Sequence, residues 1–361
     1  MTRERIDWLI NAIVVPLASV AAGFLVAGVA VAATGADPLA AFTALFQGAI
    51  TNRNAFPETL VSTVPYVFLG LGVALGFRAG LFNIGAEGQF YIGALTGVFV
   101  AYSVHGLPSV IEIPLALLAG MAGGFGWSAI AGFLKARFGA HEVITTIMLN
   151  YVAFLVANYL VDTPGLMLAP NVSTPRTPDV DVNAILPIIY AGSRLHFGFI
   201  VALIAVPLVW FLIQRTTTGF ELRAVGFNPG AAQAAGISVG RTMVLAMGLS
   251  GALAGAAGIV QVLVVQHHMT DTVAAGYGFD AIAIALLARS NPWGVLPAAL
   301  LFGALRSGAS FMQLQTDVSA DLISIVQASV IIFVAAPAIV RWIFRLRPDA
   351  TGSLQITGRE S

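Results

Sequence analysis

Apolar runs of about 20 residues follow one another along almost the whole chain, separated by short polar links. Hydrophobic residues make up 58% of the 361 residues and charged residues only 9%, whereas soluble domains carry about 25% charged residues. A run of this length crosses the hydrocarbon core of a bilayer as one helix. Because lipid offers the backbone no hydrogen-bond partner, a helix must satisfy its own backbone groups. We therefore predict an all-α, polytopic membrane protein.

The runs predict about ten membrane segments, including short or broken helices. The eighth run is too short to cross a bilayer upright, which favours a half-helix or a re-entrant element. A further stretch over 38–50 is typical of a helix at the membrane interface. The ten runs lie near residues 9–33, 59–77, 84–103, 114–134, 143–161, 197–214, 243–265, 279–289, 294–312 and 322–341.

Basic residues are divided unequally between the two sides that these segments create. With the N-terminus inside and the first run retained as a helix, thirteen fall inside, three outside and Arg306 within a span. Since basic residues favour the cytoplasmic side, we expect both termini there. The transmembrane domain then covers 1–348, with an outer loop over 162–196, an inner loop over 214–242 and a cytoplasmic tail over 349–361. The inner residues are Arg3, Arg5, Arg78, Lys135, Arg137, Arg215, Arg223, Arg241, Arg289, Arg341, Arg345, Arg347 and Arg359.

A polar, glycine-rich stretch interrupts the apolar pattern at residues 80–89, Gly-Leu-Phe-Asn-Ile-Gly-Ala-Glu-Gly-Gln. A carboxylate at hydrocarbon depth costs about 2.5–3.5 kcal/mol on insertion scales. Irregular backbone is tolerated there only if protein or a wet cavity surrounds it. We predict that Glu87 faces a translocation pathway or orders its lining, and that a helix start is directed at its carboxylate. The alternative is an ordinary cytoplasmic turn in which Glu87 is solvated.

Further polar residues fall inside or beside the apolar runs and carry groups that could line a polar pathway. The amides have a plainer alternative, because Asn and Gln often bond across helices for about 1 kcal/mol or less. Asp280 and Arg306 are charges that need a partner, water or a cavity. Either they pair with each other, or Asp280 contacts the substrate. The pathway candidates are Asn83, Glu87, Gln89, Asn150, Tyr151 and Asp280.

The inner loop contains the pattern of a short helix with both ends capped. Asn228 suits the N-cap and Pro229 the first helical position, and Gly236 is a C-terminal stop after four alanines. A two-turn helix is unstable alone, so it must pack on something. We expect an element that transmits motion to the membrane segments rather than a solvated linker. Its candidate residues are Glu221, Arg223, Gly226, Asn228, Ala232 and Gly236.

Patterns typical of enzymes and metal sites are absent from the sequence. A phosphate-binding loop needs Gly-Lys followed by Ser or Thr, and the only lysine, Lys135, stands between Leu134 and Ala136. The five histidines show no metal-ligand spacing, and there is no cysteine. The net charge of zero gives no indication of a nucleic-acid partner. We therefore expect a chain that is not an enzyme and that binds no cofactor of its own.

Three stretches resemble one family of transporters. Residues 81–89, Leu-Phe-Asn-Ile-Gly-Ala-Glu-Gly-Gln, are followed by Gly93-Ala94-Leu95. Residues 142–151 read Glu-Val-Ile-Thr-Thr-Ile-Met-Leu-Asn-Tyr, and residues 276–287 read Gly-Tyr-Gly-Phe-Asp-Ala-Ile-Ala-Ile-Ala-Leu-Leu. They resemble the permease subunits of ABC importers of the branched-chain amino acid, ribose and nucleoside group, above all its nucleoside branch. The inner loop, Gly-x-x-Leu-Arg-Ala-x-Gly-x-Asn, is similar to the coupling loop of that group.

The resemblance implies the membrane subunit of an ATP-driven importer of nucleosides, in a bacterial plasma (inner) membrane. It implies a second permease subunit as a heterodimer partner, and an ABC ATPase that binds ATP and Mg²⁺. A third partner is an extracytoplasmic solute-binding protein or lipoprotein. Five segments per half would allow two inverted repeats that meet near residues 190–200. Within the group, sugar or branched-chain amino acid import is the alternative; an ion-coupled secondary transporter is the alternative from another class.

Overall fold

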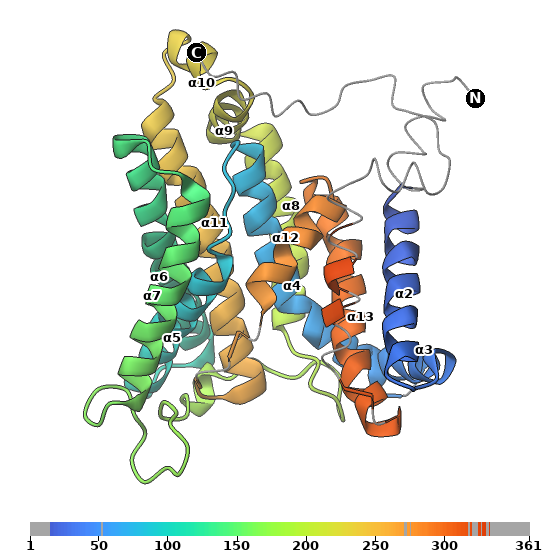
Figure 1. Ribbon diagram of the computed structural model, residues 1–361. Helices are drawn as coiled ribbons and strands as arrows, with labels where there is room; N and C mark the ends of the chain where they lie inside the picture. The colour runs from blue at the N-terminus through green and yellow to red at the C-terminus, as the bar shows by residue number, and fades with distance from the viewer. Residues whose placement is uncertain are drawn as a thin grey trace. The chain divides into compact units, whose positions relative to one another are not determined.

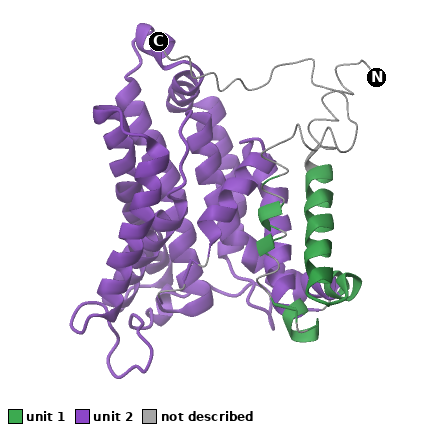
Figure 2. Ribbon diagram, viewed as in Figure 1, with its two compact units in different colours: residues 1–43, 312–361 green, residues 44–311 purple. Residues whose placement is uncertain are grey.

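The computed structural model describes residues 15–51, 53–270, 273–274, 276–316, 318–319, 324–325, 327–329 and 332. Within these ranges the chain is helical, and its only β pairing is an isolated antiparallel bridge between Ile188 and His196. The all-α prediction is confirmed for this part of the chain. The chain divides into one compact unit of residues 1–43 and 312–361 and another of residues 44–311, shown in green and purple in Figure 2.

Most of the helices form in the predicted apolar runs (Figure 1). Short π-helical turns follow α3 at Gln47–Thr51 and α11 at Val262–Gln266, and the outer loop holds a 3-10 turn at Val182–Ala184. The α-helices are α2 (Val15–Ala33), α3 (Pro38–Phe46), α4 (Ala55–Arg78), α5 (Ala86–Ser103), α6 (Ser109–Phe138), α7 (Glu142–Asp162), α8 (Gly198–Arg215), α9 (Thr217–Phe227), α10 (Pro229–Ala234), α11 (Val239–Gln261), α12 (Tyr277–Leu287) and α13 (Pro292–Thr316).

Among the residues that the structure describes, six helices are long and apolar enough to cross a membrane: α4, α6, α7, α8, α11 with its π-helical continuation, and α13. They correspond to six of the ten predicted segments. The described parts of the runs near 9–33, 84–103 and 279–289 also form helices, α2, α5 and α12, which do not meet that standard over the described residues. The run near 322–341 lies mostly outside the described residues. The multi-pass membrane prediction is therefore supported, while the total of ten segments stays a prediction.

Two central helices, α4 and α11, organise the unit of residues 44–311. Within an apolar 18-residue window of each helix, 83% of the α4 window and 72% of the α11 window are buried. The corresponding share is 22% for α6 and for α7. α11 packs on α4, α5 and α6. α6 and α7 consequently keep broad apolar surfaces that face away from this core.

Glycines allow α6 and α11 to pack at very short range. Gly120 and Gly124 lie one turn apart on α6, and Gly251 and Gly255 do so on α11. A Cβ atom on Gly251 would collide with the carbonyl oxygen of Gly124, and one on Gly255 with that of Gly120. In lipid, where the hydrophobic effect does not hold helices together, such backbone contact supplies much of the packing energy.

The short helix α12 begins in the interior of the bundle. Before α12, the carbonyl of Met269 accepts a hydrogen bond from the N–H of Thr177, which belongs to the outer loop. Beyond α12, the carbonyl of Ser290 accepts a hydrogen bond from the Nε–H of Arg78 at 3.0 Å. This bond lies near the end of the molecule opposite the outer loop, where α9 and α10 lie (Figure 1). With 11 residues, α12 is about 16 Å long, roughly half of a 30 Å hydrocarbon core. The short helix predicted from the eighth run is confirmed.

Candidate functional site

The carboxylate of Glu87 lies against the start of α12. Glu87 belongs to the first turn of α5 and is only 8% exposed. Its Oε1 accepts the N–H of Gly276 at 2.8 Å, and its Oε2 accepts the N–H of Gly278 at 2.5 Å. Amides in the first turn of a helix have no partner within that helix, and the helix dipole favours a negative charge there. The structure thus places a helix start at this carboxylate, as predicted, and buries Glu87 instead of leaving it in a solvated turn.

Two glycines permit this contact. Gly276 has φ +89°, a left-handed conformation that costs glycine little. A Cβ atom on Gly278 would collide with the backbone nitrogen of Glu87. A side chain at position 278 would therefore push α12 away from α5 and open both hydrogen bonds.

Asn83 and Gln89 bond to each other at the non-helical segment that leads into α5. Asn83 Nδ2 donates to Gln89 Oε1 and to Ser250 Oγ, both at 2.8 Å, and Asn83 Oδ1 accepts Gln89 Nε2 at 2.8 Å. The same oxygen accepts the N–H of Gly85 at 3.0 Å. Ser250, on α11, donates in turn to the carbonyl of Gly72 on α4 at 2.7 Å. This buried network joins α4, α5 and α11, which matches the plainer reading of these amides as bonds across helices.

Asn150 attaches α7 to the same region. Its Oδ1 accepts the N–H of Gly88 at 2.8 Å, and its Nδ2 donates to the carbonyl of Ile84 at 3.0 Å. The next residue, Tyr151, is 66% exposed on the outward side of α7, because successive residues of a helix differ by about 100° in direction. The structure therefore brings Asn150 to the Glu87 region and leaves Tyr151 away from it.

A cluster of charged and aromatic side chains adjoins Glu87. Tyr66 Oη donates to Asp280 Oδ2 at 2.6 Å. The Tyr277 ring lies 4.8 Å from that of Tyr66, edge to face, and is stacked with that of Phe90 at 6.0 Å, as measured between ring centroids. The Arg306 guanidinium carbon lies 3.9 Å from the Tyr277 centroid, where the face of the ring attracts a cation. Arg306 also attracts the Asp280 carboxylate electrostatically, so the cluster combines flat aromatic walls with two opposite charges.

Two members of this cluster, Tyr66 and Tyr277, are not among the residues predicted from the sequence. Tyr277 stands inside the stretch 276–287 that carries the family resemblance, so a signal for it existed. Tyr66 lies in the middle of an apolar run, 214 residues before Asp280. Only the packing of α4 on α12 brings these two residues together.

The inner loop forms two capped helices. Thr216 Oγ1 accepts the N–H of Gly219 at the start of α9, and Asn228 Oδ1 accepts the N–H of Ala231 at the start of α10, both at 3.0 Å. The chain leaves α10 through Gly236, with φ +84°. The capped helix predicted after Asn228 is confirmed, although α10 has only six residues. The longer helix α9 before it is an element that the sequence pattern does not predict.

The helix α9 touches the turn between α4 and α5. A Cβ atom on Gly226 would collide with the carbonyl oxygen of Arg78. Gly80 has φ +71°, and a Cβ built on it would lie 3.1 Å from the Cα of Gly226. Arg223 Nη1 donates to the carbonyl of Ile213, which fixes α9 to the end of α8. A displacement of α9 towards this turn therefore presses on the segment that leads to the Glu87 region.

The surface of α9 and α10 combines buried and exposed positions. Ala232 is buried, and its carbonyl accepts the N–H of Ile237 at 3.0 Å. Glu221 is exposed on α9. Phe227, the last residue of α9, is 94% exposed. A bare aromatic ring at this end of the molecule is typical of a protein contact surface.

Comparisons with known proteins cover most of the chain. A family described as branched-chain amino acid transport system / permease component matches residues 56–335. The guanosine ABC transporter permease protein NupP of Bacillus subtilis is 39% identical over 340 residues, covering 92% of this chain and 95% of that protein. The nucleoside ABC transporter permease protein NupB of Lactococcus lactis is 34% identical, covering 91% and 92%.

A sugar permease also matches. The glucose ABC transporter permease protein TsgB13 of Haloferax volcanii is 37% identical, covering 88% of this chain and 86% of that protein. Each of the three organisms has a second matching permease protein, at 25% to 30% identity. No solved structure matches the chain.

Replacement of Glu87 tests the junction between α5 and α12. Glu87→Gln keeps one acceptor oxygen and loses the charge, whereas Glu87→Leu leaves two buried amides unpaired, each at a cost of about 1–3 kcal/mol. We expect a small loss of thermal stability and uptake for Gln and a large loss of both for Leu, measured at matched expression. Glu221→Leu, on an exposed part of α9, is the stability control. Wild-type uptake by the Glu87→Leu variant would show that Glu87 is a dispensable turn residue.

Proposed function

The chain belongs to the family of branched-chain amino acid transport system permease components, and we propose that it carries nucleosides through the membrane. This membership confirms the resemblance predicted from the three sequence stretches. The chain is the permease subunit of an ABC importer and is not itself an enzyme. A separate ATPase chain would bind ATP and Mg²⁺, because this sequence contains no phosphate-binding loop.

One observation carries the choice of nucleosides. The chain is 39% identical to a guanosine permease and covers 95% of it, and the nucleoside permease NupB agrees at 34%. The 37% identity to a glucose permease makes a sugar the second candidate. Family membership gives no support to an ion-coupled secondary transporter.

The cluster beside Glu87 supplies chemistry that suits a nucleoside. The rings of Tyr66 and Tyr277 are buried, at 0% and 5% exposed. They support Asp280 and Arg306 through the hydrogen bond from Tyr66 and the contact of Arg306 with the Tyr277 ring. Asp280 can accept hydrogen bonds from the base edge or the ribose hydroxyls, and Arg306 can donate them. Both side chains are partly accessible. We therefore assign substrate contact to this cluster, with Asp280 as the residue that the sequence already indicated.

The amide residues of the region have a different proposed role. Asn83, Gln89 and Asn150 use their polar groups in bonds to the protein itself. Glu87 likewise uses both carboxylate oxygens on the start of α12. We propose that these four residues hold the lining of the pathway in place. Tyr151, on the outward face of α7, is available instead to lipid or to another subunit.

We propose partner subunits that the family and the matched pairs of permeases support. A second permease in each of the three organisms supports a heterodimer of two related permease chains. The exposed Phe227 and the capped helix α10 are suited to contact an ABC ATPase. The outer loop over 162–196 is suited to an extracytoplasmic solute-binding protein or lipoprotein. These contacts define an assembly in which only the ATPase subunits consume ATP.

The proposed orientation places α9 and α10 in the cytoplasm, together with both termini, in a bacterial plasma membrane. The excess of basic residues on that side supports it. Two inverted repeats of five segments would give α5 and α12 corresponding places. Their resemblance is local: each has a carboxylate in its first turn, Glu87 and Asp280. A boundary near 190–200 would coincide with the start of α8.

The proposed coupling runs from α10 and α9 to the turn between α4 and α5. ATP binding would close the ATPase subunits and displace α10. The contact between Gly226 and Gly80 would pass that displacement to the segment ahead of Glu87. The junction with α12 would then shift, and the pathway would change the side to which it opens. A ligand shifts such an equilibrium only through its different affinity for the two states.

Reconstitution tests the function directly. Proteoliposomes should contain this chain together with the proposed second permease, ATPase and solute-binding protein. We expect uptake of radiolabelled guanosine that requires ATP on the side of the membrane that carries the ATPase. This uptake should disappear when the ATPase is omitted. Uptake of glucose but not guanosine would favour the sugar permease. Gradient-driven uptake by this chain alone would contradict the ABC assignment.

A substitution at Gly226 tests the coupling route. Gly226→Val places a branched side chain against the backbone of Arg78, which cannot move without shifting the α4–α5 turn. We expect loss of transport and of transport-stimulated ATP hydrolysis, with insertion into the membrane unchanged. Gly126→Val is the matched control, because nothing lies within 4 Å of a Cβ at that exposed position of α6. Normal coupled transport by Gly226→Val would refute this route.

A further inference from the structure

A hollow of about 950 Å³ lies beside α6 and α11, near the end of the molecule that carries α9 and α10. α6 contributes Phe125, Phe133 and Arg137 to its lining, and α11 contributes Arg241 and Leu245. The link from α10 to α11 forms a further part of the wall. Neither the Glu87 junction nor the contact of Gly226 with Gly80 belongs to this hollow. Its combination of apolar side chains and arginines calls for a separate explanation.

We propose that this hollow is a binding site for an anionic phospholipid. In this site the phosphate lies at the two arginines, and an acyl chain follows the phenylalanines of α6. The proposal concerns the membrane around the protein and does not depend on which solute the importer carries.

The apolar part of the lining is suited to an acyl chain. Phe133 is 53% exposed, and Phe125 and Phe133 are eight residues apart, which places them on one side of α6. Only 22% of the most apolar window of α6 is buried within the chain. The wall of the hollow is thus continuous with a broad apolar surface of a membrane span. In the proposed site, the acyl chain lies along this surface.

The charged part of the lining is suited to a phosphate. Arg137 lies in the last turn of α6 and Arg241 in the first turns of α11, so both stand where these apolar spans reach the membrane surface. Both arginines are exposed, and neither forms an ion pair among the residues that the structure describes. One carboxylate, Glu221, shares the lining, which leaves an excess of one positive charge. A guanidinium binds a phosphate through two parallel N–H groups.

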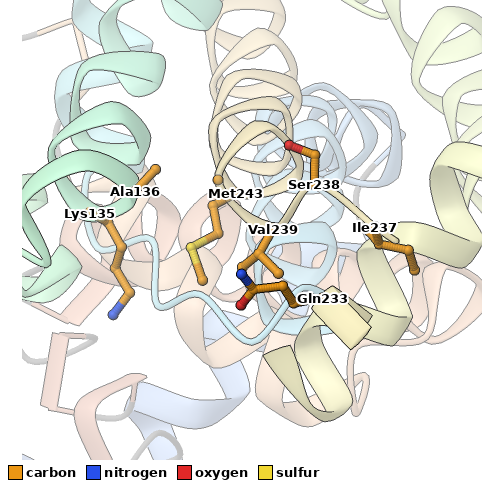
Figure 3. Close-up of a pocket in the computed structure, with 8 residues that line it drawn as sticks. Lys135, Ala136, Gln233, Ile237, Ser238, Val239 and Met243 are labelled. Atoms are coloured by element: carbon orange, nitrogen blue, oxygen red, sulfur yellow. The ribbon is translucent and has the colours of Figure 1, made fainter. Parts of the chain in front are cut away.

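The neighbouring cation, Lys135, is already paired with a carboxylate of the protein. Lys135 donates to Glu142 Oε2 at 2.6 Å and lines a smaller hollow of about 420 Å³, which shares Ile237 and Ser238 with the larger one. Figure 3 shows Lys135 on one side of this smaller hollow and Gln233 on the other. Because Lys135 is already paired with Glu142, the proposed phosphate would be bound by Arg137 and Arg241.

Native mass spectrometry of the full chain in detergent tests the site, with dioleoyl-phosphatidylglycerol as the probe. An arginine at a membrane surface favours an anionic lipid by about 1 kcal/mol, so loss of both should weaken binding about 30-fold. We expect this loss in the double variant Arg137→Gln with Arg241→Gln. The charge-preserving double variant with lysine at both positions should retain most of the binding. Arg215→Gln, at the end of α8 and outside the hollow, should bind as the wild type does.

Three outcomes would overturn the proposal. One is equal retention of phosphatidylglycerol by the wild type and the double glutamine variant. Another is equal binding of dioleoyl-phosphatidylcholine, which would show that the arginines make no distinction between headgroups. The third is displacement of the lipid by glycerol phosphate at equal concentration, which would indicate a site for a free anion without an acyl chain. Parallel thermal unfolding curves separate a loss of binding from a loss of folding.

Discussion

The hydrogen bonds between the Glu87 carboxylate and the first amides of α12 hold together two helices that begin inside the bundle. A helix start at hydrocarbon depth leaves amides without water and without intrahelical partners. Glu87 satisfies two of them and is itself stabilised by their partial positive charge. The absence of a side chain at Gly278 brings the two backbones close enough for this arrangement. The positions of Tyr277 and Asp280 in the adjoining cluster depend on where this junction fixes α12, because both residues belong to its first turn.

The polar groups of the region fall into two classes with different consequences. Those of Asn83, Gln89 and Asn150 are used up by bonds within the protein, which makes the non-helical segment ahead of α5 rigid. Asp280 and Arg306 remain partly accessible beside stacked aromatic rings. A permease needs both classes: a lining that keeps its shape, and a few groups that can bind a polar solute weakly and release it.

The sequence predicts the elements better than it predicts the contacts. The helical class, the short eighth segment and the cap at Asn228 follow from hydropathy and local chemistry, and all are found. Glu87 is singled out because a carboxylate between apolar runs is costly, but its partners lie 189 and 191 residues away. The pairing of Tyr66 with Asp280 has no local signal at Tyr66. Asn83 and Gln89 suggest substrate chemistry by residue type alone, and only the fold shows that they bond to each other.

Hydrogen–deuterium exchange at the start of α12 tests the central role of Glu87 most directly. The measurement compares the wild type with Glu87→Leu in the purified full chain, using peptides that contain Gly276 and Gly278. We predict slow exchange of these amides in the wild type and much faster exchange in the variant, with peptides from the middle of α7 unchanged. Equally slow exchange in both proteins would contradict it, because α12 would then be held in place without the carboxylate.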